Sequence, residues 1–270
     1  MLDVQRISKT FYAGTPNEVR ALQNVDLKIE DGSFTIVVGT NGSGKSSLLN
    51  AVAGTFPVDS GSLHIADQDV TDWPEHARAR LIGRVFQNPF SGTAPQMSIA
   101  ENVALAARRG RARGLMWAVT PGLAKEIRNR VSQLGMRLED RLNNSIGTLS
   151  GGQRQALTLL MATWLKPQLL LLDEHTAALD PKSADQVIRL SQEVIQRDNL
   201  TAMMVTHSMQ QAAGLGDRLI MMYRGRIIHD FSGAEKRRLR AEDLLARFDD
   251  VRRGELLDES AAEMLRRRYV

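Results

Sequence analysis

A glycine- and hydroxyl-rich segment carries the clearest chemical signal in this chain: Gly39-Thr40-Asn41-Gly42-Ser43-Gly44-Lys45-Ser46. It follows the apolar run Phe34 to Val38 and precedes an amphipathic segment that begins at Ser47, which predicts a strand leading through a turn into a helix. Glycines in such a turn let consecutive N–H groups point inward at the helix N-terminus, Lys45 adds positive charge, and the Ser46 hydroxyl can reach a magnesium ion. The segment predicts a cradle for nucleotide phosphates. A flexible linker, the alternative, is rarely placed between a strand and an amphipathic helix.

Two adjacent carboxylates follow a second apolar run, Leu169 to Leu172. Parallel sheets bind their ligands at the carboxyl ends of the strands, so Asp173 and Glu174 are expected at that edge. Asp173 can hold the magnesium, directly or through water, and Glu174 can polarise an attacking water as a general base. A solvated acidic loop is the alternative interpretation.

A second glycine-containing motif, Leu149-Ser150-Gly151-Gly152-Gln153, precedes a predicted helix with an apolar face. Ser150 and Gln153 fit a capping box, which is a local structural role. That role does not explain two consecutive glycines, which weaken a helix and are useful mainly where something approaches the backbone closely. The functional interpretation is a second helix N-terminus that faces phosphate.

Composition bounds the class of protein. The chain has 270 residues, of which 43% are apolar and 24% charged, which predicts one large folded domain or two small ones. The formal net charge of +4 is too small to require a nucleic-acid partner, so none is expected. No apolar stretch has the roughly 18 residues that a membrane-spanning helix needs, the N-terminus lacks a signal-peptide pattern, and cysteine is absent. A cytosolic location is expected.

The order of periodic patterns predicts a mixed α/β architecture. Alternation over Val25 to Ile29, followed by Asp31-Gly32 and the Phe34 to Val38 run, predicts a hairpin in an antiparallel N-terminal sheet. The apolar runs Leu169 to Leu172 and Ala202 to Val205 predict strands of a buried parallel sheet. Helical signals dominate residues 88–165, beginning with a capping box at Ser98, and a second hairpin is predicted over residues 219–228.

With these motifs in this order, residues 1 to about 230 resemble the nucleotide-binding ATPase of an ABC transporter; the motif Leu149 to Gln153 matches the family signature LSGGQ letter for letter. The resemblance implies a P-loop NTPase of α/β class, with a mostly parallel core sheet, an N-terminal antiparallel β subdomain and an inserted α-helical subdomain. Residues 1–87 and 166–230 are expected to form the core and the antiparallel sheet, 88–165 the helical subdomain, and 231–270 a charge-rich helical extension.

The resemblance also implies roles for individual residues. Phe11, with Tyr12 as its rival, is expected to stack on the adenine of ATP, although either ring can serve packing alone. Gln87 is expected to contact magnesium and the attacking water, Asp180 to lie in a loop that crosses to a partner subunit, and His207 to hydrogen-bond the γ-phosphate. A lone histidine after a strand is otherwise usually structural. The catalytic set is therefore Lys45, Gln87, Glu174 and His207, and the magnesium ligands are Ser46, Gln87 and Asp173.

In this family the signature of one subunit caps the nucleotide held by the phosphate loop of the other. The resemblance therefore implies a head-to-tail dimer, either a homodimer or a pair with another ABC subunit, in which Ser150, Gly151, Gly152 and Gln153 complete the partner's ATP site. It further implies permease subunits in the membrane and peripheral association with its cytoplasmic face. A proline commonly follows the catalytic carboxylate in the family, whereas His175 stands here. His175 is expected to alter the stiffness of the loop, or else to add a titrating group near the γ-phosphate.

The segment Phe86 to Pro95, together with His175, resembles a bacterial importer group that is often proposed to take up amino acids, with an extracytoplasmic binding protein that delivers the solute. Two other classes stay open. A non-transport ABC ATPase, such as a cofactor-assembly scaffold, is distinguished by its failure to copurify with an integral membrane protein. A small-molecule kinase is distinguished by its need for an acceptor substrate, and it leaves the motif at Ser150 without a role.

Overall fold

Two β-sheets form the centre of the computed structural model, which describes residues 1–110, 119–251 and 253. The antiparallel sheet contains β1 (Leu2–Phe11), β2 (Val19–Ile29), β4 (Ser60–Ile65) and β5 (Gln68–Asp69), in the order β2-β1-β4-β5. The second sheet contains β3 (Phe34–Gly39), β6 (Ile82–Val85), β7 (Leu169–Asp173), β8 (Ala202–Val205), β9 (Arg218–Tyr223) and β10 (Arg226–Ser232). Its order is β10-β9-β3-β8-β7-β6, and only β10 pairs antiparallel.

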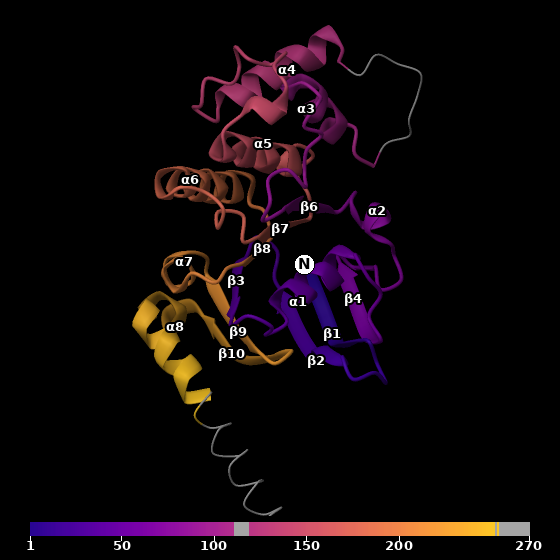
Figure 1. Ribbon diagram of the computed structural model, residues 1–270, viewed down its shortest axis with the longest axis vertical. Coiled ribbons are helices and arrows are strands. Elements are labelled where there is room, and N and C mark those ends of the chain that lie inside the picture. The colour runs from indigo at the N-terminus through magenta and orange to yellow at the C-terminus, as the bar shows by residue number, and fades with distance from the viewer. Residues whose placement is uncertain (111–118, 252, 254–270) are drawn as a thin grey trace, which may run out of the picture.

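Helices surround these sheets in distinct groups (Figure 1). Helices α3, α4 and α5 gather at the top of the view, and α1 packs into one hydrophobic cluster with the antiparallel sheet below them. The predicted α/β class, with a mostly parallel core, an antiparallel N-terminal sheet and a helical segment, is confirmed. The helices are α1 (Lys45–Ala53), α2 (Glu75–Arg78), α3 (Ile99–Ala107), α4 (Pro121–Ser132), η1 (Ile146–Thr148), α5 (Gly151–Thr163), α6 (Pro181–Asp198), α7 (Met209–Gly214) and α8 (Gly233–Arg238).

The parallel sheet is buried on both faces, and this explains its uninterrupted apolar runs. Along β7, Leu169 and Leu171 face one hydrophobic cluster together with α1 and the antiparallel sheet. Leu170 and Leu172 face the opposite cluster, together with α6 and α7. A third cluster joins α3, α4 and α5. The sheet therefore has a covered face on each side, and its exposed carboxyl edge remains for ligands.

The predicted hairpin between residues 25–29 and 34–38 is wrong. β2 pairs with β1 in the antiparallel sheet, whereas β3 pairs parallel with β8 and β9 in the other sheet. The turn between them passes the chain from one sheet to the other, with Gly32 at a φ of 72°. The physical reason is burial: every residue of β3 is buried, whereas β2 alternates, and a strand buried on both faces needs neighbours within the covered sheet.

Other local predictions are confirmed. β9 and β10 form an antiparallel hairpin around Arg224 and Gly225. Ser98 caps α3 in a capping box with Glu101. Within the described part of residues 88–165, every regular element is helical.

The region after residue 230 packs onto the core sheet. β10 runs through Ser232, so this strand crosses the predicted start of the extension at residue 231. Residues 241–251 are helical, and Leu244 and Phe248 from this helix join the cluster that covers one face of the sheet. The described portion of the extension therefore completes the core. Among the described residues, none of the helices combines the length and apolarity that a membrane crossing requires.

Arg78 ties the C-terminus of α1 to the antiparallel side of the molecule. Its side chain is 1% exposed. Its guanidinium donates to the carbonyls of Ala51 at 2.7 Å, Val52 at 2.9 Å, Trp73 at 2.9 Å and Thr71 at 3.0 Å. The Ala51 and Val52 carbonyls belong to the last turn of α1, where helical N–H donors run out; of these two carbonyls, the Ala51 carbonyl also accepts from the Gly54 N–H at 3.2 Å.

Replacing Arg78 with methionine is expected to lower the free energy of unfolding by about 3 kcal/mol, because buried carbonyls lose charged donors. Urea unfolding measures the change. The control is Arg80→Met, which alters an exposed guanidinium lying 4.5 Å from the Trp73 ring centroid and is expected to cost at most about 1 kcal/mol. Equal small changes in both variants would contradict the capping role of Arg78.

Candidate active site

Four parallel strands end at one edge of the core sheet, and each is followed by a residue singled out from the sequence. β3 leads into the glycine-rich loop, β6 leads to Gln87, β7 ends at Asp173 and is followed by Glu174, and β8 leads to His207. Because parallel strands have their carboxyl ends on the same side, the topology brings these segments together although they are distant in sequence.

The glycine-rich loop is shaped by close backbone contacts. Gly44 caps the N-terminus of α1 at a φ of 101°, and a Cβ there would lie 2.6 Å from the carbonyl oxygen of Ala21. A Cβ on Gly39 would lie 2.3 Å from Ser43 Oγ. Both glycines are therefore required by the fold, before any ligand is considered. Asn41, Gly42 and Ser46 are exposed along this loop, and Ser47 is half-buried.

Two polar groups of the loop point to anion binding. Lys45 is buried, and its Nζ donates to the carbonyls of Gly39 at 2.9 Å and Thr40 at 3.0 Å. Burial lowers the pKa of Lys45, and the nearby charges of Glu174 and Asp173 oppose that shift. Ser43 Oγ is buried and has no hydrogen-bond partner within the described structure. An oxyanion in the loop would supply an acceptor for such donors.

Asp173 lies beside a cation that the sequence reasoning missed. Arg84, on the neighbouring strand β6, approaches Asp173 Oδ2 at 3.4 Å and donates to Asn50 Oδ1 of α1 at 2.6 Å. Burial raises the pKa of Asp173, and Arg84 opposes this shift. The sequence signal that could have identified Arg84 is its position as the single charged residue in the otherwise apolar run Ile82 to Phe86. Arg84 thus connects the acidic end of β7 to the helix of the phosphate loop.

Gln87, Glu174 and His207 meet at this edge. Glu174 Oε2 lies 3.1 Å from His207 Nδ1 and 3.4 Å from Gln87 Nε2. Glu174 has a φ of 42°, in the left-handed region that costs a non-glycine residue roughly 1 to 2 kcal/mol. Its amide N–H donates to the Val205 carbonyl at 2.9 Å, which holds this backbone conformation against β8. The carboxylate of Glu174, carried on a strained backbone, therefore lies between the Gln87 amide and the His207 imidazole.

His175 does not face this cluster. Its side chain is 1% exposed, and its Nε2 lies 3.0 Å from Ser191 Oγ on α6. Burial lowers the pKa of His175 to about 4. The hypothesis that His175 adds a titrating group near the γ-phosphate is therefore wrong, because the residue after Glu174 turns into the packing against α6.

The motif at Ser150 forms the N-terminus of α5. Ser150 Oγ accepts from the Gln153 N–H at 3.3 Å, and Gln153 Oε1 accepts from the Ser150 N–H at 3.2 Å, so the predicted capping box is confirmed. The chain itself approaches both glycines. A Cβ on Gly152 would lie 2.8 Å from Ser183 Cβ, and one on Gly151 would lie 3.0 Å from Leu179 Cδ2. Close packing against the start of α6 thus accounts for Gly152, whereas Gly151 meets only the flexible end of Leu179 and remains exposed, as does Ser150.

Asp180 begins α6. Its Oδ1 accepts from the Ser183 N–H at 3.1 Å, and hydrogen bonds from Ser183 hold the pKa of Asp180 below its usual range. Asp180 therefore has a local capping role. Ser183, in the first turn of α6, packs against Gly152, so the segment that begins at Asp180 lies against the N-terminus of α5.

The two candidate aromatic residues differ in their surroundings. The Phe11 ring packs edge-on against Phe56, with centroids 5.1 Å apart, and lies 5.7 Å from Lys9 Nζ. Tyr12 is 71% exposed and has a φ of 54°. Phe11 is the last residue of β1 and Tyr12 follows it; the partner strand β2 carries the Ala21 carbonyl next to Gly44.

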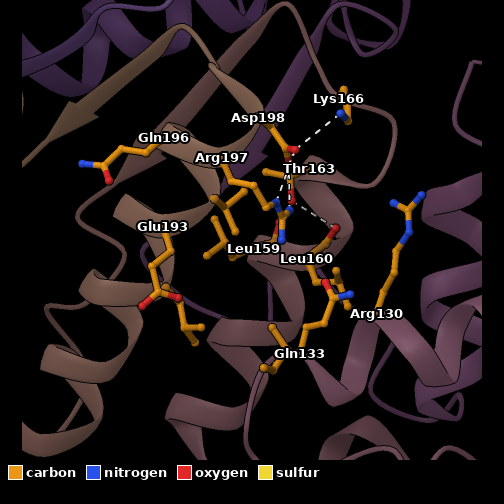
Figure 2. Close-up of a pocket in the computed structure, with 13 residues that line it drawn as sticks. Arg130, Gln133, Leu159, Leu160, Thr163, Lys166, Glu193, Gln196, Arg197 and Asp198 are labelled. Atoms are coloured by element: carbon orange, nitrogen blue, oxygen red, sulfur yellow. Dashed lines mark hydrogen bonds and ion pairs between the residues drawn. The ribbon is translucent and has the colours of Figure 1, made fainter.

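A cavity of about 620 Å³ lies at a different place, among α4, α5 and α6 (Figure 2). Its apolar floor includes Leu159 and Leu160, while Arg197 and Lys166 both pair with Asp198 at its rim. Lys166 and Asp198 precede β7 and β8, at the amino ends of these strands. The cavity is therefore separated by the length of the strands from the edge that carries Glu174 and His207.

Comparisons with known proteins agree with this geometry. Residues 22–177 match the family model described as ABC transporter. The chain is 38% identical over 251 residues to a tyrosine transport ATP-binding protein of Clostridioides difficile (strain R20291), covering 92% of this chain and 99% of that protein. It is 35% identical over 231 residues to a lipoprotein-releasing system ATP-binding protein LolD of Ruegeria pomeroyi, covering 84% and 96%. The dimeric, post-hydrolysis ATP-binding cassette MJ0796, bound to ADP and Pi, is similar with a TM-score of 0.74 and 28% identity, covering 86% and 98%.

Proposed function

Because this chain belongs to the ABC transporter family, of which it is an ATP-hydrolysing subunit, we propose that it powers solute transport through a separate membrane permease. The observation that carries the proposal is the meeting of Gln87, Glu174 and His207 at the sheet edge beside Lys45. A phosphate-binding loop and a carboxylate placed between two polar side chains suit hydrolysis of a nucleoside triphosphate.

In the proposed reaction Glu174 accepts a proton from the attacking water, while His207 and Lys45 both donate to the γ-phosphate. Gln87 orients the same water through its amide. The strained backbone of Glu174 and its hydrogen bond to Val205 fix the direction of the carboxylate. Pre-oriented groups of this kind lower the barrier because little reorganisation accompanies the reaction.

A divalent cation fits the same edge by donor chemistry. Ser46, Gln87 and Asp173 offer hydroxyl, amide and carboxylate oxygens, which are the ligands that Mg²⁺ prefers. The half-buried carboxylate of Asp173, whose pKa is raised by desolvation, would gain a favourable neighbour in the cation. When bound, magnesium supplies charge neutralisation for the phosphates; these three residues are the ones proposed to hold it.

Replacing Lys45 with alanine is expected to weaken ATP binding by about tenfold to a hundredfold, since a charged donor worth roughly 1.5 to 3 kcal/mol is removed from the phosphates. Equilibrium titration with a fluorescent ATP analogue measures the affinity. The control is Lys182→Ala, which alters an exposed lysine on α6. Unchanged affinity in the Lys45 variant would remove the loop from the nucleotide site.

The proposed assembly is a head-to-tail dimer, of two copies or of this chain with a related subunit. Support comes from Ser150 and Gly151, which are exposed at the N-terminus of α5, where backbone N–H groups and the helix dipole favour an anion. The similar cassette of known structure is dimeric and bound to ADP and Pi. In the proposed dimer these groups cap the triphosphate held by the partner's loop, together with Gly152, Gln153 and the loop at Asp180.

The proposed docking surface for the permease lies beside α3. A groove of about 350 Å³ runs between α3, α5 and the segment after Gln87. Leu105 lines this groove and is 54% exposed, and Phe90, in the segment after Gln87, is a second large apolar residue, 50% exposed. Exposed apolar side chains next to a groove are typical of a contact surface, and this position lets Gln87 sense the partner. The protein would accordingly sit peripherally at the cytoplasmic face of the membrane.

The proposed transport is import of an amino acid, delivered by an extracytoplasmic binding protein. It is supported by the 38% identical relative named for tyrosine transport, which the chain covers almost completely, and by the Phe86 to Pro95 segment. The lipoprotein-releasing relative shows that similar cassettes serve other cargo. A cofactor-assembly scaffold is the second candidate, although both relatives described above carry names from transport systems.

The experiment is recovery of the tagged chain from detergent-solubilised cells, followed by identification of copurified integral membrane proteins. A stoichiometric permease is expected, and the complex, reconstituted in vesicles and supplied with its binding protein outside, is expected to take up labelled tyrosine only when ATP is present inside. Recovery with soluble assembly proteins alone would overturn the transport proposal. Uptake of another solute would retain transport and replace the substrate.

A further inference from the structure

The loops that carry Glu174 and His207 are connected by a further side chain, that of Gln211. Gln211, in the first turn of α7, accepts a hydrogen bond at Oε1 from the Thr206 hydroxyl at 2.9 Å. Its Nε2 donates to Thr176 Oγ1 at 3.2 Å. Thr206 immediately precedes His207, and Thr176 follows Glu174 by two positions. One amide group therefore bridges the two loops that present the carboxylate and the imidazole.

The bridge is well placed to resist movement. Thr206 and Thr176 are 3% and 6% exposed, so water competes poorly for their hydroxyls. Thr206 Oγ1 also accepts from the Ser208 N–H at 3.1 Å, and the Gln211 N–H donates to Ser208 Oγ at 3.3 Å. The turn around His207 is thereby closed on both sides by hydrogen bonds that include Gln211.

The contact between His207 and Glu174 is too weak to hold the two side chains in place by itself. The His207 side chain is 59% exposed, and even a fully ionised pair at an exposed position contributes only roughly 0 to 1 kcal/mol. The backbone joins the loops at the ends of β7 and β8, where the Glu174 N–H donates to the Val205 carbonyl at 2.9 Å. A second restraint beyond the strand ends is needed to keep the 3.1 Å separation, and Gln211 supplies it.

We infer that Gln211 is a positioning residue, which holds His207 at Glu174 for hydrolysis and acts through His207 rather than on the nucleotide. The inference rests on the proposed function of that site. The Gln211 amide is also connected indirectly to the loop before Asp180. It contacts Thr176, and the Thr176 carbonyl accepts from the Leu179 N–H at 3.2 Å. Gln211 thus connects the histidine of the site to the loop proposed to face the partner subunit.

The test compares Gln211→Met with Gln211→Glu in the full chain. Methionine keeps the length but can neither accept from Thr206 nor donate to Thr176, so kcat is expected to fall about tenfold, with KM for ATP changed less than about twofold. Glutamate is expected to retain most of kcat, because both threonine hydroxyls can donate to a carboxylate. The matched control is Gln210→Met, which alters an exposed glutamine on the same helix.

A double-mutant cycle separates positioning from general stability. In a His207→Ala background, Gln211→Met is expected to cause no further loss of kcat, because its route of action is already removed. Thermal unfolding is measured for every variant, and Thr176→Val serves as a second way to break the bridge. Multiplicative losses, equal losses with methionine and glutamate, or wild-type kcat in Gln211→Met would each overturn the inference. Wild-type kcat in His207→Ala alone would instead overturn the role of His207 in the proposed function.

Discussion

Glu174→Gln is expected to lower ATP turnover by about a hundredfold to ten-thousandfold, the usual contribution of a general base. The amide has nearly the same shape and can still contact Gln87 and His207, which lie 3.4 and 3.1 Å from Glu174 Oε2. It cannot accept the proton of the attacking water. ATP binding should therefore change only a few-fold, since Lys45 and the glycine-rich loop are untouched.

Bound ATP that is not hydrolysed should keep the two subunits together. Light scattering with ATP is expected to show the Glu174→Gln variant as a dimer, while the wild-type chain returns to monomer as ATP is consumed. Phosphate release in a single turnover measures the chemical step itself. The matched control is Glu193→Gln, an exposed carboxylate on α6 away from this edge. A Glu174→Gln variant that hydrolyses ATP near the wild-type rate would remove Glu174 from the base role.

Features of the site that depend on adjacent residues could be predicted from the sequence. The loop from Gly39 to Ser46 and the capping box at Ser150 are each encoded within a few positions, where spacing and turn chemistry are local. The apolar run before Asp173 was sufficient to place it at the end of a buried strand, because such runs are typical of sheets covered on both faces.

Features that depend on tertiary packing could not be predicted. Gln211 lies 35 residues from Thr176, and their contact depends on how α7, which follows β8 and lies against β3, is placed in the folded chain. Arg84 reaches Asp173 across neighbouring strands, 89 residues apart. The direction of the His175 side chain was ambiguous for the same reason. Glu174 and His175 are adjacent in sequence, yet Glu174 faces the site and His175 packs against α6. The error at β2 and β3 arose because a short turn fits a hairpin and also a transfer between sheets.

Ser150→Arg should abolish ATP turnover while the monomer retains its affinity for ATP. The arginine side chain would occupy the exposed N-terminus of α5, where a partner's triphosphate is proposed to dock, and the glycine-rich loop of the same chain would be unchanged. Loss of the Ser150 hydroxyl also removes an N-cap, which costs about 1 kcal/mol. Ser150→Ala, which loses the same cap without adding bulk, is therefore the matched control for stability and is expected to retain more turnover.

Mixing chains distinguishes a shared site from damage within one subunit. Lys45→Ala and Ser150→Arg are each expected to be inactive alone, but a mixed dimer pairs the intact loop of the Ser150→Arg chain with the intact Ser150 of the Lys45→Ala chain. With random pairing, half of the dimers would carry one complete site of two, so about a quarter of wild-type turnover is expected if the sites work independently. Ser150→Arg chains that remain monomeric yet hydrolyse ATP at the wild-type rate would show that each subunit completes its own site.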